Sequence, residues 1–272
     1  MIHYNFNRMK DGIIRMEQDN RFAVLIDADN VSEKYIKFIL NEISNDGVAT
    51  YKRIYGDWTK PALGMWKNVL LEYSITPIQQ YGYTTGKNAT DSAMIIDAMD
   101  ILYSGNVEGF CIVSSDSDFT RLAVRLRESG MYVVGMGEKK TPQAFISACN
   151  KFRYLDVLAQ VDTSPAEPDE AEDETASAEM TPLETIKSAV QTIVREISDD
   201  DGRAFVGELG NMLVRRYPDF DVRNYGFRKL TPFLKSFDVF DIYSERNSDG
   251  YNKLVYVKEK CSPNQNVKNI KR

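Results

Sequence analysis

The 272-residue chain is 43% hydrophobic and 27% charged, which is ordinary for a globular protein and leaves room for one α/β domain and a smaller second one. A single histidine, His3, and three cysteines at irregular spacing argue against Ser-His or Cys-His catalysis, against a zinc site and against a disulfide framework. No apolar run reaches the length of a membrane span, and residues 1–20 form a polar leader without the apolar core of a secretory signal, so we expect a cytoplasmic protein with a disordered leader.

The net charge of −6 is unevenly distributed along the chain. Residues 162–180 contain eight acidic residues, no basic residues and no aromatic residues, which is the composition of a disordered segment. Without these eight acids the rest of the chain has a net charge of +2. The acidic total is therefore weak evidence against a nucleic-acid partner, and we place a disordered acidic linker at residues 159–180.

The chain before this linker alternates between apolar strand-like runs and amphipathic helix-like segments. Predicted strands cover residues 22–27, 48–55, 74–81, 109–114 and 131–136. Predicted helices follow them at residues 32–40, 62–73, 93–103, 118–129 and 142–149. This alternation predicts a three-layer α/β/α sandwich with a parallel five-stranded sheet over residues 21–158. Pro77 places the third strand at or near a sheet edge, but the order of the other strands stays open.

The chain after the linker has a different pattern. Three helices are predicted at residues 183–197, 204–216 and 225–237, followed by a hairpin of strands 238–243 and 253–257. Three helices and a hairpin predict a small winged-helix-like α+β domain over residues 181–258. Residues 259–272 form a polar, basic tail.

Acidic residues gather where predicted strands give way to helices. The five are Asp27, Asp29, Asp91, Asp116 and Asp118. Any one of them fits equally well as a helix cap. As a set they lie on one side of the predicted sheet, where open α/β sheets bind ligands, and neighbouring carboxylates repel one another unless a cation lies among them. Oxygen ligands without His or Cys favour Mg²⁺ or Mn²⁺.

Two other motifs suggest different chemistry. The loop from Gly82 to Lys87 is one residue too short for a phosphate-binding loop, and no Ser or Thr follows Lys87. Asp27-Ala28-Asp29 resembles the DxD motif of haloacid-dehalogenase-type phosphatases, in which the first Asp is a nucleophile. A helix is predicted directly after this motif, which leaves no room for the flap of such enzymes, but a phosphomonoesterase stays an alternative.

The acidic motifs resemble those of the NYN domain, a PIN-like nuclease family that includes the LabA/DUF88 proteins. The resemblance covers residues 22–155 and is carried by Asp27-Ala28-Asp29-Asn30, by residues 87–91 and by Ser115-Asp116-Ser117-Asp118-Phe119. It implies that the catalytic residues, which hold Mg²⁺ or Mn²⁺, are Asp27, Asp91, Asp116 and Asp118. It also implies that Asn30 contacts the substrate or a metal ligand, and Ser115 stands where a glycine is frequent in the family.

Residues 182–258 resemble an OST-HTH/LOTUS domain. The resemblance is carried by residues 208–213, 217–221 and 224–230. It implies RNA binding, although some such domains bind helicase partners, so a protein-binding module is the alternative. The residues that could form a basic face are Arg215, Arg216, Arg223, Arg228 and Lys229.

Together these features predict a metal-dependent ribonuclease, with endonucleolytic cleavage expected and DNA as an alternative substrate. Lys87 and Arg53 are candidate contacts for the substrate, alongside Asn30 and Ser115. The second domain is expected to select RNA while tethered to the catalytic domain through the linker. The competing hypothesis is a non-catalytic RNA- or protein-binding adaptor with a vestigial metal site.

Overall fold

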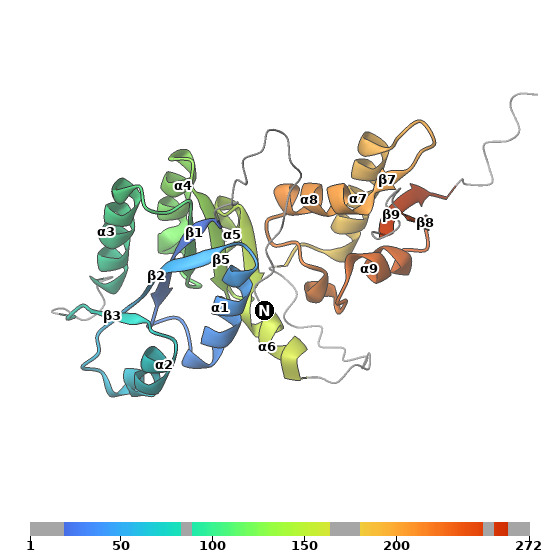
Figure 1. Ribbon diagram of the computed structural model, residues 1–272. Helices are drawn as coiled ribbons and strands as arrows, with labels where there is room; N and C mark the ends of the chain where they lie inside the picture. The colour runs from blue at the N-terminus through green and yellow to red at the C-terminus, as the bar shows by residue number, and fades with distance from the viewer. Residues whose placement is uncertain (1–18, 83–88, 164–179, 247–252, 261–272) are drawn as a thin grey trace, which may run out of the picture.

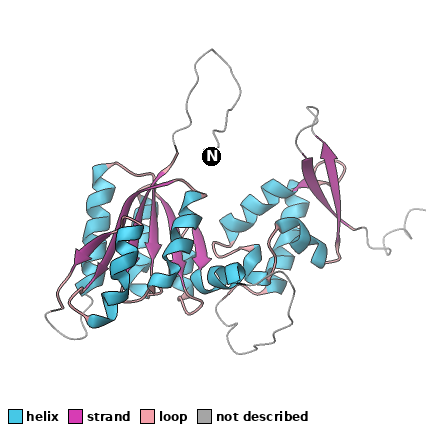
Figure 2. Cartoon of the chain, turned by 60° about the horizontal axis from the view of Figure 1, so that its bottom comes forward, coloured by secondary structure: helices cyan, strands magenta, loops and turns pink. Residues whose placement is uncertain are grey.

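The computed structural model describes residues 19–82, 89–163, 180–246 and 253–260. The larger lobe is a sheet with helices on both faces, and the smaller lobe holds three helices and a short sheet (Figure 1). A second view shows the helices around the large sheet and the hairpin at the far end of the smaller lobe (Figure 2).

The larger lobe is built on a parallel sheet of six strands, in the order β3-β2-β1-β4-β5-β6. The strands are β1 (Arg21–Asp27), β2 (Val48–Gly56), β3 (Thr76–Gln79), β4 (Gly109–Val113), β5 (Tyr132–Gly137) and β6 (Lys151–Tyr154). This order is typical of doubly wound sheets, with the change of direction between β1 and β4. The strand that contains Pro77, β3, lies at the sheet edge as predicted.

The prediction of five strands is wrong by one. The sixth strand, β6, is only four residues long and reads Lys-Phe-Arg-Tyr, a mixed sequence that resembles a loop more than a buried strand. Its amide at Phe152 donates to the carbonyl of Pro218 at 2.7 Å, so this sheet edge is completed by the smaller lobe. The sequence of residues 151–154 alone does not indicate that Pro218 is its partner.

Two apolar clusters cover the two faces of the sheet. One contains residues of α3 (Ala89–Ser104), α4 (Thr120–Glu128) and α5 (Gln143–Ala148). The other contains residues of α1 (Ile36–Ser44), η2 (Pro61–Met65), α2 (Trp66–Glu72) and α6 (Leu155–Thr163). Strands β1 and β4 contribute to both clusters, which explains why they are apolar at nearly every position. No helix in the described part of the chain is long and apolar enough to span a membrane.

Helix α6 differs from the expected boundary, because it runs to Thr163 and so enters the segment in which we placed the linker. Leu155 and Leu158 of this helix are buried against the sheet and Ala159 packs on the same cluster, so the packed part of the lobe reaches residue 159. Residues 164–179 lie outside the described residues.

The smaller lobe has the predicted winged-helix-like plan. Its elements are α7 (Leu183–Ile197), β7 (Ala204–Phe205), α8 (Val206–Arg216), η4 (Val222–Tyr225), α9 (Leu230–Ser236), β8 (Phe240–Arg246) and β9 (Lys253–Glu259). Strand β9 pairs antiparallel with both β7 and β8. The predicted third helix is divided into η4 and α9, since Gly226 between them has a left-handed backbone (φ 78°).

The two lobes contact each other directly, whereas we expected them to be joined only through a tether. The loop before η4 runs along β6, where Tyr154 donates to Asp219 at 3.4 Å and Arg153 donates to the carbonyl of Phe220 at 3.3 Å. Asp219 is 2% exposed. The smaller lobe therefore packs directly on this edge of the sheet.

Four charged side chains form an ion-pair network across the boundary between the lobes. Arg223 donates to both oxygens of Glu42, at 2.7 and 3.0 Å, and also to Asp221. Arg153 lies 3.4 Å from Glu42 and 3.2 Å from Asp221. Burial raises the pKa of Glu42, but the hydrogen bonds and charge of Arg223 outweigh it, so the pKa is lowered overall. Arg223, a candidate for the basic RNA face, is therefore occupied at the lobe boundary.

We expect Glu42→Gln to lower the free energy of unfolding of the full chain by about 3 kcal/mol at pH 7, because it leaves two guanidinium groups sharing one carboxylate. The pKa values of Glu42 and Asp221 are lowered on folding, so their contribution is present at neutral pH and is lost as pH falls below their ordinary values near 4. Urea unfolding at pH 7 and pH 3.5 measures both effects. Glu128→Gln, on an exposed position of α4, is the matched control, and equal loss in both variants would contradict the network.

Candidate metal and active site

The candidate site lies at the carboxyl edge of the sheet, where β1 and β4 run side by side. Asp27 is the last residue of β1, and Ser114, Asp116 and Asp118 follow β4 directly. Helix α3 brings Asp91 to the same edge in its first turn. The strand order thus unites three chain segments, and this order is what the sequence had left open.

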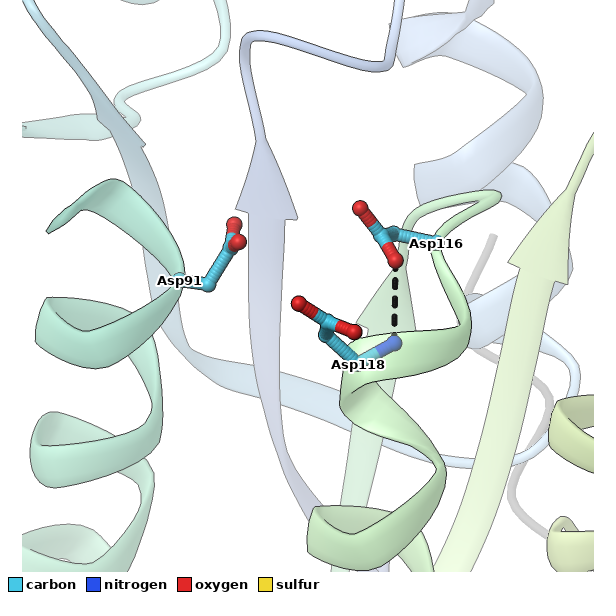
Figure 3. A group of neighbouring side chains, drawn as sticks. All are labelled: Asp91, Asp116 and Asp118. Atoms are coloured by element: carbon cyan, nitrogen blue, oxygen red, sulfur yellow. Dashed lines mark hydrogen bonds between the residues drawn. The ribbon is translucent and has the colours of Figure 1, made fainter. Parts of the chain in front are cut away.

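Three carboxylates converge in space. One oxygen from each of Asp91, Asp116 and Asp118 lies within 4.8 Å of the others. Figure 3 shows the three side chains pointing toward one another, with Asp91 on α3, Asp116 on the loop after β4 and Asp118 on the short helix Ser117–Phe119 that follows. The amide of Asp118 donates to Asp116 at 2.9 Å, which fixes the turn that carries both side chains.

Asp27 ends β1 at the same edge of the sheet and is 0% exposed. Its Oδ2 accepts hydrogen bonds from Asn30 at 2.7 Å and from Ser114 at 2.8 Å, and its Oδ1 accepts one from the amide of Asp29 at 3.0 Å. Burial raises the pKa of Asp27, although these three donors act in the opposite direction. Asp27 does not belong to the group of three converging oxygens, but its charge acts on Asp91.

Ser114 is a site residue that sequence reasoning missed. Its buried hydroxyl donates to Asp27 and accepts the amide hydrogen of Asp116 at 3.1 Å, so it links β1 to the turn after β4. A serine at the end of an apolar strand is the only signal in the sequence. That signal has meaning only once β4 is known to lie next to β1.

The electrostatics of Asp91 report the crowding of negative charge. Burial, followed by the charges of Asp27, Asp116 and Asp118, raises the pKa of Asp91 from 3.8 to about 6. Between pH 4 and 6 the folded protein without a cation therefore binds more protons than the unfolded chain and loses stability as pH rises. A cation among the carboxylates would reverse this effect.

Asp29 lies at the rim of the site. It accepts hydrogen bonds from Lys60 at 3.2 Å and from Thr90 at 3.1 Å, so it links the loop after β1 to the start of α3. Beside it lies a cavity of about 420 Å³, whose lining includes Asn30, Lys60 and Trp66. Lys60 was not predicted, because a lysine in a turn before a proline carries no distinctive signal.

The other residues predicted to contact the substrate are not all at this edge of the sheet with their side chains free. Asn30 binds Asp27, and Ser115 accepts the amide hydrogen of Glu138 at 2.9 Å, which ties the turn after β4 to the end of β5. Arg53 lies in β2, three residues before the strand ends, and forms an ion pair with Asp97 of α3. Lys87 lies outside the described residues.

The basic candidates of the smaller lobe do not form one uniform face. Arg215 and Arg216 end α8, and Arg216 pairs with Glu196. Arg228 and Lys229 are exposed ahead of α9. Arg215 is exposed and has no ion pair within the part of the chain that the structure describes.

The donor set fits a hard divalent cation. All three converging groups are carboxylates, and Mg²⁺ and Mn²⁺ prefer oxygen ligands. Asp91 and Asp116 are partly buried and Asp118 is exposed, so a bound ion would keep positions open for water or substrate oxygens. Burial and the neighbouring carboxylates raise the pKa of Asp91, and a cation bound among these groups would lower it.

We expect Asp91→Asn to stabilise the metal-free protein at pH 8 by roughly 1 kcal/mol, since it removes one repelling charge from a partly exposed group. The same variant should lose the stabilisation that Mn²⁺ or Mg²⁺ confers on the wild type. Thermal unfolding in EDTA and in metal measures both effects. Asp100→Asn, at an exposed position of the same helix, is the control and should respond to metal as the wild type does.

Ser114→Ala should lower the free energy of unfolding by about 1–3 kcal/mol, because buried polar groups lose a partner, and should weaken Mn²⁺ binding about 10–100-fold. Calorimetric titration with Mn²⁺ measures the affinity. Ser117→Ala removes an exposed hydroxyl from the same turn and should change neither quantity. Unchanged Mn²⁺ affinity in Ser114→Ala would refute its role in positioning the carboxylates.

Comparisons with known proteins identify both lobes. The NYN domain family matches residues 21–156, half of the chain, and the OST-HTH/LOTUS domain family matches residues 181–251. A crystal structure of a protein of unknown function from Vibrio parahaemolyticus is 18% identical, with 52% of this chain and 95% of that one covered and a TM-score of 0.44. A solution structure of an uncharacterised protein from Nitrosomonas europaea is 26% identical, with 36% and 93% covered and a TM-score of 0.27. No curated protein matches. The chain belongs to the NYN domain family, within the PIN-like nucleases, and carries an OST-HTH/LOTUS domain after its NYN domain.

Proposed function

We propose that the protein is a metal-dependent ribonuclease that cuts RNA endonucleolytically, with its LOTUS domain contributing to RNA binding. The observation that carries this proposal is the convergence of Asp91, Asp116 and Asp118 at the carboxyl edge of an NYN domain. Asp27 supplies a fourth negative charge beside them.

The carboxylates would hold Mg²⁺ or Mn²⁺, which supplies Lewis acidity toward a phosphodiester oxygen and activates water for attack. The protein's own side chains and amides position the carboxylates. Ser114 and Asn30 fix Asp27, the amide of Asp118 fixes Asp116, and the first turn of α3 directs Asp91 toward both. These hydrogen bonds hold the carboxylates in one arrangement, and a preorganised arrangement needs little reorganisation when the substrate binds.

The cavity beside Asp29 gives the substrate a place to lie. Its apolar wall includes Leu63 and Trp66, and Lys60 and Lys140 bring positive charge to its lining. A nucleotide next to the scissile phosphate could contact this wall while Lys60 lies near its phosphate. Lys87, close to Asp91 in sequence, remains a second candidate for this contact.

The test is incubation of the full chain with a labelled single-stranded RNA, and with the same RNA circularised, in Mn²⁺, Mg²⁺ or EDTA. We expect metal-dependent cleavage of both substrates, since only an endonuclease opens the circle. Asp91→Asn and Asp116→Asn should each reduce the rate by about 100-fold or more, the scale of losing one electrostatic contribution to the transition state. Asp100→Asn should cleave as the wild type does.

Three outcomes would contradict the proposal. RNA binding without cleavage, equal in wild type and in both variants, would indicate an adaptor with a vestigial metal site. Hydrolysis of p-nitrophenyl phosphate that depends on Asp27 alone would indicate a phosphomonoesterase. Cleavage of single-stranded DNA in preference to RNA would indicate a deoxyribonuclease.

A further inference from the structure

A cleft of about 800 Å³ separates the NYN and LOTUS domains. One wall is formed by the amino edge of the large sheet, including Asp46, Tyr132 and Lys151, and the other by α8, including Asn211 and Arg215. In Figure 1, α8 is the helix of the smaller lobe that faces the larger one. The volume is within the range of about 300–1,000 Å³ typical of ligand sites.

The lining of this cleft is strongly basic, although the whole protein has a net charge of −6. Its charged residues are Arg127, Lys151, Arg153, Arg215, Arg216 and a single acid, Asp46. Lys151 neutralises Asp46, at 2.7 Å. The cleft is therefore the place where basic residues of both domains gather.

Two of these cations, one on each wall, are not neutralised by a carboxylate among the described residues. Arg127 donates to the carbonyls of Ser147 and Ala148, at 3.4 and 3.2 Å, and these groups orient its guanidinium without cancelling its charge. Arg215 is exposed on α8. By contrast, Arg153 and Arg216 pair with acids at the cleft margins.

The cleft also offers an aromatic surface. Tyr132 lines it and is 40% exposed, with its ring packed edge-on against Phe22. Exposed aromatic rings beside arginines are the combination that binds single-stranded nucleic acid, because bases stack on the ring while phosphates meet the cations.

Direct contacts join the two walls of the cleft. The network of Arg223, Arg153, Glu42 and Asp221 and the hydrogen bond from Phe152 to Pro218 join the domains at the base of the cleft. A ligand therefore finds the two cations already placed, which lowers the entropic cost of binding.

We propose that this cleft binds a single-stranded RNA segment, with Arg127 and Arg215 on its phosphates and Tyr132 against a base. The proposal rests on the proposed RNA substrate. The cleft lies at the start of β5 and the carboxylates lie at the opposite sheet edge, a span of roughly 17 Å for six strand residues. The segment held here is thus distinct from the segment at the carboxylates, and the cleft acts as a remote anchor.

The experiment measures binding of the full chain to a fluorescein-labelled 20-nucleotide oligouridylate by anisotropy, in EDTA and at several KCl concentrations. The doubly substituted Arg127→Glu, Arg215→Glu protein should bind at least tenfold more weakly than wild type. The control carries Lys67→Glu and Lys235→Glu, the same charge change at exposed positions outside the cleft, and should stay within threefold. Neutral Arg127→Gln, Arg215→Gln should lower the salt slope by about 1.4, since each phosphate contact on a single strand contributes about 0.7.

Equal weakening in the cleft and control proteins, or none in either, would overturn the cleft proposal. Binding of polyglutamate as tight as that of RNA would also overturn it, in favour of an acidic protein partner. If Arg127→Glu unfolds the chain because the two carbonyls lose their donor, Arg215→Glu alone should still weaken binding at least threefold.

The readout needs no catalysis, so the two proposals fail separately. If the wild type cleaves RNA but the cleft variants bind RNA as tightly as the wild type does, the cleft proposal alone is refuted. Cleft-dependent RNA binding with no cleavage in any metal would refute the nuclease alone.

Discussion

The parallel pairing of β1 with β4 is the constraint on which the rest of this molecule depends. It brings the end of β1 beside the turn after β4, and α3 then adds Asp91, so that four carboxylates share one edge of the sheet. Their repulsion is a cost that the fold itself does not require, because helix capping would need only one acid at each position. The raised pKa of Asp91 is the sign of that cost. A cation among the carboxylates converts it into binding energy, and this argues for a metal site.

Much of this arrangement follows from local sequence. Strands β1 and β4 are apolar on both faces, as central parallel strands must be, and each ends in acids, so their position and the identity of Asp27, Asp116 and Asp118 could be predicted. The pairing itself could not, because the spacing of strands along the chain does not fix their order. Ser114 was missed for that reason, since its hydroxyl matters only when Asp27 is its neighbour.

The same limit explains the errors at the boundary between the domains. Strand β6 has no continuous apolar run, and its partner Pro218 lies 66 residues away from Phe152. Arg223 lies between Arg216 and Arg228 in the sequence and was grouped with them, whereas its side chain binds Glu42 in the structure. Long-range ion pairs leave no local pattern, because either partner would read as a solvated surface charge. The consequence is functional: the LOTUS domain packs directly on the NYN domain and presents α8 across a basic cleft.

The most direct measurement is the diffraction of crystals soaked in Mn²⁺, recorded at the manganese absorption edge. The account predicts an anomalous peak between Asp91, Asp116 and Asp118, with carboxylate oxygens as its protein ligands, and no such peak in Asp91→Asn crystals soaked in the same way. A wild-type site without manganese at saturating concentration, or with manganese bound elsewhere on the molecule, would contradict the claim that these carboxylates form a metal centre.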